Sequence, residues 1–143
     1  MIYFSIITVV KNSEKFIYDC LKSLNNQSYK KYEHIIIDGG STDKTLKIIN
    51  KFKKIKKENR IKLFKFKNKG LYQSLNYGIN VAKGEYVGVL HSDDFYYSNK
   101  ILYKIKKILS NKKLDLIYSN ILFCKRNDKK KYNRSFNPGK YQK

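Results

Sequence analysis

The sequence contains no tryptophan, one proline and two cysteines in 143 residues. The cysteines, Cys20 and Cys124, lie far apart in apolar patterns, which indicates small core residues rather than a disulfide or a metal-binding pair. With one proline and seven glycines, the chain is neither of low complexity nor rich in linkers. A chain of this length forms one domain and leaves little room for a second.

Long hydrophobic runs are also missing. No apolar stretch approaches the roughly 18 residues that a membrane-spanning helix needs. The apolar start over 1–10 is cut short by Lys11 and lacks a charged leader and a cleavage site, so it predicts a buried strand and not a signal peptide. We therefore expect a reduced, cytoplasmic compartment, with peripheral attachment to the inner membrane face as a further option.

Acidic residues and arginine are scarce too. The sequence has 11 Asp and Glu against 32 Lys and Arg, a formal net charge of +21, and nearly all the basic residues are lysine. Readers of DNA sequence favour Arg because its guanidinium pairs bidentately with guanine, so we expect no nucleic acid partner. The favoured interpretation is a solvated, Lys-rich surface. Attraction to an anionic membrane surface is the second interpretation.

Apolar runs alternate with helical periodicity about four times along the chain. Strands are expected at 2–10, 32–37, 61–66, 85–90 and 114–123, with amphipathic helices between them. Asn12 or Ser13, and Ser41 or Thr42, are expected to cap the first two helices. The alternation predicts an α/β fold with a mostly parallel sheet and helices on both faces.

The composition changes beyond Cys124, where the chain is polar, basic and without period. This predicts a ligand-binding domain over 1–124, followed over 125–143 by a basic tail, a loop or the start of a missing acceptor-binding part.

Polar side chains gather where the predicted strands end. The four segments are Thr8-Val9-Val10-Lys11-Asn12, Asp38-Gly39-Gly40-Ser41-Thr42-Asp43, Asn68-Lys69-Gly70 and His91-Ser92-Asp93-Asp94. Ligands of open α/β sheets bind in the crevice outside the carboxyl ends of the strands. The second segment lacks both the dinucleotide G-x-G-x-x-G and the phosphate-loop G-x-x-x-x-G-K-[ST] patterns, which disfavours those two cofactor classes.

Asp93 and Asp94 form an adjacent acidic pair next to a predicted buried strand. Two neighbouring carboxylates repel each other and lose hydration unless something neutralises them. One interpretation is helix capping, with Asp94 before the positive end of a helix expected near 97–110. The other is a divalent cation, Mn²⁺ or Mg²⁺, held by one or two carboxylates together with substrate phosphates.

Together these segments resemble glycosyltransferase family 2, whose catalytic domain has the GT-A, Rossmann-like architecture of nucleotide-diphospho-sugar transferases. The matching segments are, in order, 4–12 (FSIITVVKN), 34–45 (HIIIDGGSTDKT), 68–79 (NKGLYQSLNYGI) and 82–94 (AKGEYVGVLHSDD). On this resemblance, Thr8 and Asn12 match the loop that lies along the nucleotide. Asp38 matches the carboxylate that contacts the base, and Lys69 lies in the segment that closes over it.

The resemblance also implies a metal site. Asp93 matches the second acidic position of the family's D-x-D motif, the usual contact of the divalent cation, and Asp94 follows it directly. The sequence departs from the motif at its first position, where His91 stands. A neutral imidazole still hydrogen-bonds a ribose hydroxyl, but it supplies no negative charge.

The implied activity is inverting transfer of a hexosyl or N-acetylhexosaminyl group from a nucleotide-diphospho-sugar, most often a UDP-sugar. The implied acceptor is a glycan or a lipid-linked glycan in cell-surface polysaccharide synthesis. The family's general base is a carboxylate beyond the last core strand, and neither Asp115 nor Asp128 matches its context. We therefore expect the base and the acceptor-binding part to be missing from 1–143. Two alternatives stay open: a truncated, non-catalytic nucleotide-binding remnant, and a basic nucleic-acid-binding module.

Overall fold

The computed structural model describes residues 1–67, 69–111, 114–117, 121–125 and 128–136, with side chains described as far as 117. The chain divides into two compact units, Met1–Lys104 and Ile105–Lys143. In the described part of the chain, no helix is both long and apolar enough to cross a membrane.

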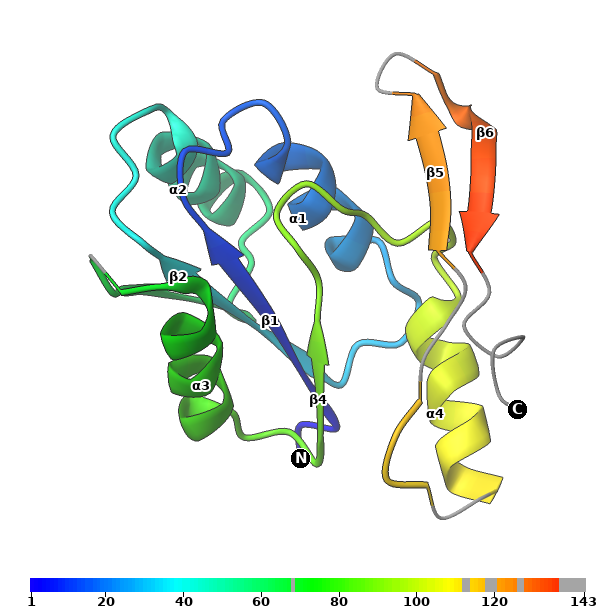
Figure 1. Cartoon of the computed structure of the whole chain (residues 1–143). Coiled ribbons are helices and arrows are strands. Elements are labelled where there is room, and N and C mark those ends of the chain that lie inside the picture. Colours follow the sequence, from blue (N-terminus) through cyan, green and yellow to red (C-terminus); the bar gives the residue numbers. More distant parts are fainter. Residues whose placement is uncertain (68, 112–113, 118–120, 126–127, 137–143) are drawn as a thin grey trace. The chain divides into compact units, whose positions relative to one another are not determined.

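The first unit is built on a four-stranded parallel sheet (Figure 1). Its strands are β1 (Phe4–Val10), β2 (Tyr32–Asp38), β3 (Ile61–Lys65) and β4 (Tyr86–Val89), in the order β3-β2-β1-β4. All three neighbouring pairs are parallel. The two central strands, β1 and β2, are buried almost throughout, as expected for parallel strands that are covered on both faces.

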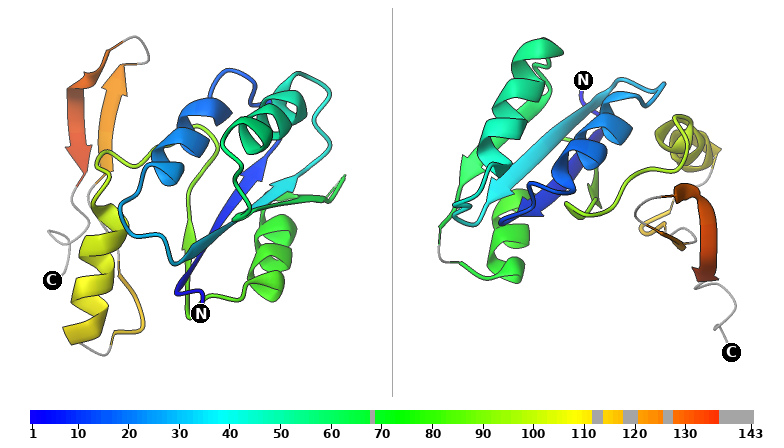
Figure 2. Two further views of the ribbon diagram at one scale, coloured as in Figure 1. Left: turned by 180° about the vertical axis from the view of Figure 1, so that it is seen from behind. Right: turned by 90° about the horizontal axis from the view of Figure 1, so that it is seen from above.

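Helices cover both faces of this sheet. The two faces carry α1 (Ile17–Asn25) with α2 (Thr45–Ile55), and α3 (Leu71–Val81), respectively (Figures 1 and 2). A buried cluster of Ile7, Ile35 and Ile37 packs against residues of α3. The α/β fold with a parallel sheet and helices on both faces, predicted from the alternating periodicity, is thereby confirmed.

The glycine of α3 sets how closely this helix approaches the sheet. A Cβ atom at Gly78 would lie 2.8 Å from Cγ2 of Ile7 and 2.9 Å from Cδ1 of Ile37. Any side chain at this position would therefore push α3 away from β1 and β2.

The second unit differs from the sequence-based expectation. After α4 (Ile101–Asn111), which begins in the first unit, come β5 (Ile121–Lys125) and β6 (Asp128–Phe136), which pair with each other in antiparallel fashion. The predicted strand over 114–123 is confirmed for 121–123, which lie in β5, and is wrong for 114–117, which are not in a strand. Residues 118–120 lie outside the described residues.

The prediction of a loop or tail beyond Cys124 does not hold for 128–136, which form β6. Residues 126–127 and 137–143 lie outside the described residues, and the alternative, the start of an acceptor-binding part, stays a prediction. The sequence of β6, DKKKYNRSF, does not alternate apolar with polar residues, so it carries no periodic signal for a strand. The domain boundary predicted after Cys124 falls inside this hairpin, in which Cys124 pairs with Tyr132.

The first two helices begin later than their expected caps. The residues at the N-cap positions are Phe16 for α1 and Lys44 for α2, and neither makes a side-chain capping hydrogen bond. Asn12 and Ser13, and likewise Ser41 and Thr42, are therefore not the caps of these helices. Their polar atoms instead form hydrogen bonds between the two loops.

Candidate functional site

The candidate site lies at the edge of the sheet where the parallel strands end. The loops after β1, β2 and β4 all leave the sheet at this edge (Figure 1). In parallel sheets this is the edge at which ligands bind. The hydrogen bonds between these loops decide how rigid the site is before a ligand arrives.

Asn12 joins the loop after β1 to the loop after β2. It has a positive φ of 51°, a left-handed conformation that asparagine tolerates better than most residues. Its backbone N–H donates to Oγ of Ser41 at 3.0 Å. Its side-chain Oδ1 accepts from the backbone N–H of Thr42 at 2.8 Å. Asn12 is exposed, so the same side chain that holds the two loops together also reaches solvent.

A second set of hydrogen bonds joins the same two loops. The N–H of Glu14 donates to Oδ2 of Asp43 at 3.1 Å, and the N–H of Lys44 donates to Oε2 of Glu14 at 2.9 Å. The N–H of Ser13 donates to Oγ1 of Thr45 at 2.8 Å. We call these cross-loop bonds of residues 12–14 with 41–45 the loop clasp.

Asp43 is the most strongly bonded carboxylate of the loop clasp. Its Oδ1 also accepts from the backbone N–H of Thr45 at 2.9 Å. Desolvation alone would raise the pKa of Asp43, but the hydrogen bonds from Thr45 and Glu14 hold it below its usual value. Asp43 therefore stays ionised and keeps the clasp closed over the ordinary pH range.

Asp38, expected to contact the base, lies at the end of β2 and is only 1% exposed. Its carboxylate accepts from the backbone N–H of Gly40 at 3.2 Å and from that of Ser41 at 3.1 Å. Gly40 has a φ of 96°, which glycine adopts without strain. In this structure Asp38 stabilises the turn that presents Ser41 to Asn12, and its contact with a base stays a prediction.

Thr8, expected beside the nucleotide, is completely buried. Its hydroxyl donates to the backbone carbonyl of Leu90 at 2.7 Å and lies 2.9 Å from Nε2 of His34. Because the single hydroxyl proton goes to Leu90, Nε2 of His34 is the donor in the second bond. Thr8 thus fastens the end of β1 to the residue that follows β4, and its contact with the nucleotide stays a prediction.

His34 supports Thr8 from the neighbouring strand. Complete burial lowers the pKa of His34 to about 3, although the nearby Glu58 acts in the opposite direction. The imidazole is therefore neutral at physiological pH, which suits its place in the core and its bond to Thr8.

Directly after Leu90 come His91-Ser92-Asp93-Asp94, which we call the acidic turn. The N–H of Asp94 donates to the carbonyl of His91 at 3.0 Å, which closes the turn. His91, Asp93 and Asp94 are exposed. Oγ of Ser92 lies 2.9 Å from Oγ of Ser13, so the acidic turn is joined to the loop clasp.

Helix capping does not explain the acidic pair. Helix α4 begins at Ile101, seven residues after Asp94, which is too far for a capping bond. Desolvation, and after it the charge of Asp93, raises the pKa of Asp94, while His91 acts in the opposite direction. The structure therefore holds a second negative charge where that charge is unfavourable without a cation.

The negative charge of the acidic turn also affects the buried thiol of Cys20. Burial raises the pKa of Cys20 to about 12, and the charges of Asp94 and Asp93 add to this effect. Cys20 is completely buried and is a free thiol, which confirms the prediction of a small core residue. The side chain of Cys124 lies outside the described residues.

The donor set of the acidic turn fits a hard divalent cation that brings other ligands with it. Within the described residues, no group of three or more His, Cys, Asp or Glu side chains could hold a metal ion. Two carboxylates, with phosphate oxygens and water in the other positions, are a common set for Mg²⁺ and Mn²⁺. Asp93 and Asp94 are the residues that would hold such an ion.

Lys69 is the remaining predicted residue. It is exposed and is separated from the start of α3 by Gly70. The structure therefore brings together Asn12, Asp38 and the acidic turn through hydrogen-bonded loops, whereas no hydrogen bond joins Lys69 to this set among the described contacts. The pairing partners Ser13, Glu14 and Asp43 were missed from the sequence, although Asp43 lies in one of the rim segments.

Comparison with known proteins shows what this chain is similar to. The profile described as Glycosyl transferase family 2 matches residues 5–143. The chain is 40% identical over 121 residues to an uncharacterised glycosyltransferase of Haemophilus influenzae, covering 84% of this chain and 47% of that protein. It is 43% identical over 101 residues to the poly(ribitol-phosphate) beta-glucosyltransferase of Bacillus spizizenii, covering 68% and 16%. The chain spans about half or less of the length of these relatives.

The similar solved structures agree with these sequence matches. Residues 1–349 of S. aureus TarS, crystallised with UDP, match with a TM-score of 0.68 and 28% identity, covering 77% of this chain and 32% of that one. The complex of the same protein with UDP-GlcNAc matches with a TM-score of 0.66 and 29% identity, at the same coverage. The mannosyltransferase PcManGT of Pyrobaculum calidifontis, crystallised with GDP-Man and Mn²⁺, shares the fold, with a TM-score of 0.70, 23% identity and coverage of 75% and 32%.

Proposed function

The chain belongs to glycosyl transferase family 2, and from that membership we propose that its strand-end loops bind a nucleotide-sugar donor together with a divalent cation. In this proposal the loop clasp forms the nucleotide side of the site. The acidic turn forms the metal side, where the diphosphate would lie.

The observation that carries the proposal is the position of Ser13. Its backbone N–H bonds to Thr45 in the loop after β2, and its hydroxyl lies 2.9 Å from that of Ser92 in the acidic turn. The loops after three neighbouring strands are thus one hydrogen-bonded unit. A unit of this kind holds both sides of a site in place before the ligand binds, which lowers the cost of ordering them.

The metal part of the proposal is supported by the acidic pair itself. The raised pKa of Asp94 marks a carboxylate that a cation would stabilise in its charged form. Asp93 is the first ligand that we propose, with Asp94 as the second and His91 as a hydrogen-bonding neighbour. A cation bound here would stabilise the charge of the departing diphosphate.

The donor and the transfer are proposed from the relatives. TarS, which shares the fold at 28% identity, was crystallised with UDP and with UDP-GlcNAc, and this supports a UDP-sugar as donor. The similarity to a poly(ribitol-phosphate) beta-glucosyltransferase supports transfer of a hexosyl group to a glycan or polymer. We propose inverting transfer, and we assign no general base among the described residues.

The test is isothermal titration calorimetry of the chain with UDP and with GDP, each with and without Mn²⁺. We expect UDP to bind more tightly with Mn²⁺, and Asp93→Asn to reduce the affinity to the metal-free value. Glu85→Gln is the control, because Glu85 is an exposed carboxylate of the first unit and directly precedes β4, at the opposite end of that strand from the acidic turn.

Two results would contradict the proposal. One is UDP binding that is the same with and without Mn²⁺ in the unaltered chain. The other is an Asp93→Asn variant that keeps the full effect of Mn²⁺ while it retains the far-ultraviolet circular dichroism of the parent.

A further inference from the structure

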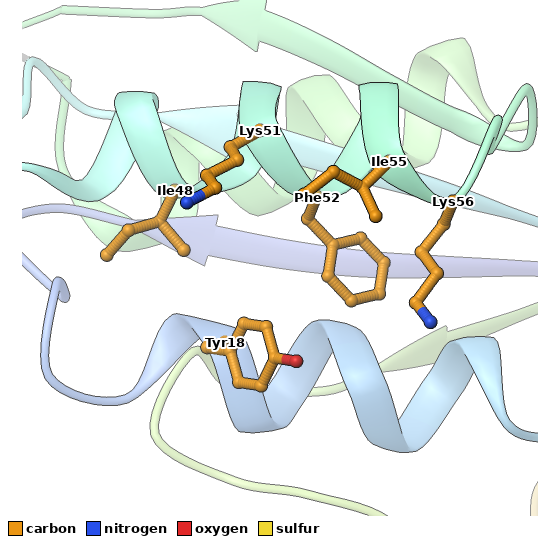
Figure 3. A pocket seen from close by; sticks show the side chains of 6 residues that line it. All are labelled: Tyr18, Ile48, Lys51, Phe52, Ile55 and Lys56. Atoms are coloured by element: carbon orange, nitrogen blue, oxygen red, sulfur yellow. The ribbon is translucent and has the colours of Figure 1, made fainter.

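A groove of about 490 Å³ opens between α1 and α2 (Figure 3). It is lined by Tyr18 of α1 and by residues on one side of α2 and just after it, namely Ile48, Lys51, Phe52, Ile55 and Lys56. Nothing in the proposed donor site uses these side chains.

The groove is apolar, and part of its lining is exposed. The ring of Phe52 is almost buried and meets the ring of Tyr18 edge-on, with 5.9 Å between the ring centroids. Tyr18 is 50% exposed and Ile55 is 63% exposed. Neighbouring apolar side chains left in water in this way are typical of a surface that contacts a partner or a membrane.

The charge around the groove is of one sign. Helix α2 carries four lysines in eleven residues and no acidic residue, and Lys56 and Lys57 follow it directly. Lys51 and Lys56 flank the apolar side chains in the groove (Figure 3). Asp19 and Lys22 of α1 add one charge of each sign, so the positive excess of this helix layer comes from α2.

We propose that the α1–α2 groove and the lysines of α2 form a docking surface for an anionic phospholipid membrane. Exposed apolar side chains beside lysines are what an interfacial helix presents to the boundary between headgroups and acyl chains. The long lysine stems extend along the apolar surface and place their ammonium groups at the phosphates. Anionic headgroups attract each such lysine.

The same features disfavour a second copy of the chain, or a nucleic acid, as the partner that covers the groove. A second copy of the chain would place α2 against another positively charged surface, because the chain carries a net charge of +21. A nucleic acid would meet the lysines but would gain nothing from Ile48 and Ile55. The attachment would be peripheral and would leave the loops of the donor site free.

The experiment is co-sedimentation of the chain with vesicles of phosphatidylcholine that contain an equal molar amount of phosphatidylglycerol. We expect binding that weakens with added salt, and little binding to pure phosphatidylcholine. Lys51→Ala combined with Lys56→Ala should weaken the binding about 30-fold, since each basic residue near such a surface contributes about 1 kcal/mol. Ile55→Ser should weaken it at least about fivefold through lost apolar contact.

The controls are matched to each change. Lys104→Ala with Lys107→Ala removes the same charge from exposed positions on α4, and Ile79→Ser removes an isoleucine that is 51% exposed on α3, on the opposite face of the sheet. Both should bind almost as the parent does.

Equal losses for the two lysine pairs would overturn the proposal, because they would show a response to total charge alone. Full binding by Ile55→Ser, or no binding to the anionic vesicles at all, would overturn it too. A dimer in analytical ultracentrifugation that Ile55→Ser dissociates would assign the groove to a second copy instead. Circular dichroism of each variant separates these results from loss of the fold.

Discussion

The hydroxyl oxygens of Ser13 and Ser92 lie 2.9 Å apart, although the two residues are separated by 79 positions in the chain. Ser13 belongs to the loop clasp and Ser92 to the acidic turn. This hydrogen bond joins the proposed nucleotide side of the site to the proposed metal side. Removing it should therefore affect the binding of nucleotide and metal together.

Ser13→Ala should weaken UDP binding by about fivefold in the presence of Mn²⁺, because a typical net hydrogen bond is worth about 1 kcal/mol. UDP binding without metal should change little, since the backbone bond from Ser13 to Thr45 remains. Calorimetry of Ser13→Ala, Ser92→Ala and the double variant measures this effect. The double variant should be no worse than either single one.

Ser110→Ala, at an exposed position on α4, serves as the control for these serine variants. If Ser13→Ala weakened UDP binding equally with and without Mn²⁺, the contact would shape the nucleotide side alone and would not connect it to the metal.

Asp94→Asn should stabilise the protein slightly when no metal is present. The pKa of Asp94 is raised in the folded state, so the folded protein loses stability as pH rises from the unfolded pKa through the folded one. This loss is present above the folded pKa and is absent from the variant. We expect a melting temperature about 1–2 °C higher, because the group is largely exposed.

Adding Mn²⁺ with UDP should reverse the order of the two proteins, since ligands stabilise only the form that binds them. Differential scanning fluorimetry with and without these ligands provides the measurement. A lower melting temperature of metal-free Asp94→Asn at pH 7 would mean that this carboxylate stabilises the turn instead.

His34 should make the protein sensitive to acid. Its pKa is lowered to about 3 by burial, so below the ordinary pKa near 6.5 the unfolded chain binds a proton that the folded protein does not. Stability therefore falls as pH decreases from about 6.5 towards 3, by up to about 1.4 kcal/mol per pH unit.

The variant His34→Gln keeps a donor for Thr8 and removes this titration. Urea unfolding between pH 7 and 4 should show a shallower decline for His34→Gln than for the parent, and carboxylates that titrate in both proteins cancel in the comparison. Parallel curves would show that His34 takes up its proton over the same pH range in the folded protein as in the unfolded chain, which would contradict a lowered pKa.

Gly84→Ala should destabilise the first unit by about 1–3 kcal/mol through overpacking. A Cβ atom at Gly84 would lie 2.5 Å from the backbone nitrogen of Ser5, which cannot move without distorting β1. Gly70→Ala is the control, because nothing lies within 4 Å of a Cβ atom there. Chemical denaturation should place Gly70→Ala within about 0.5 kcal/mol of the parent, and equal losses in both variants would contradict the packing argument.

The sheet and its helices were predictable because runs of apolar residues mark the buried strands, and apolar residues at helical spacing mark the buried face of each helix. β2 is buried at every position, and its run of apolar residues marks it as a central strand. The helix starts were not predictable in the same way. Asn12 and Ser41 have the side chains of capping residues, but here they bond across two loops, and such bonds compete with capping.

In the candidate site, too, residues marked by their local sequence were predictable, and residues with distant partners were not. Asp93 and Asp94 were identified because they follow a predicted strand directly, which is local information. Glu14 was not identified, because its partner Asp43 lies 29 residues away and nothing near Glu14 in the sequence indicates the contact. The strand β6 was missed because its sequence, DKKKYNRSF, has no apolar period.

The bond from Thr8 to the carbonyl of Leu90 fixes the chain one residue before the acidic turn begins. The base of the turn thus belongs to the core, whereas His91, Asp93 and Asp94 at its tip are exposed. Substitutions at the tip would leave the packing of the strands unchanged. The ion preferred at the proposed metal site is therefore a property that mutation, in evolution or in the laboratory, is free to alter without rebuilding the fold.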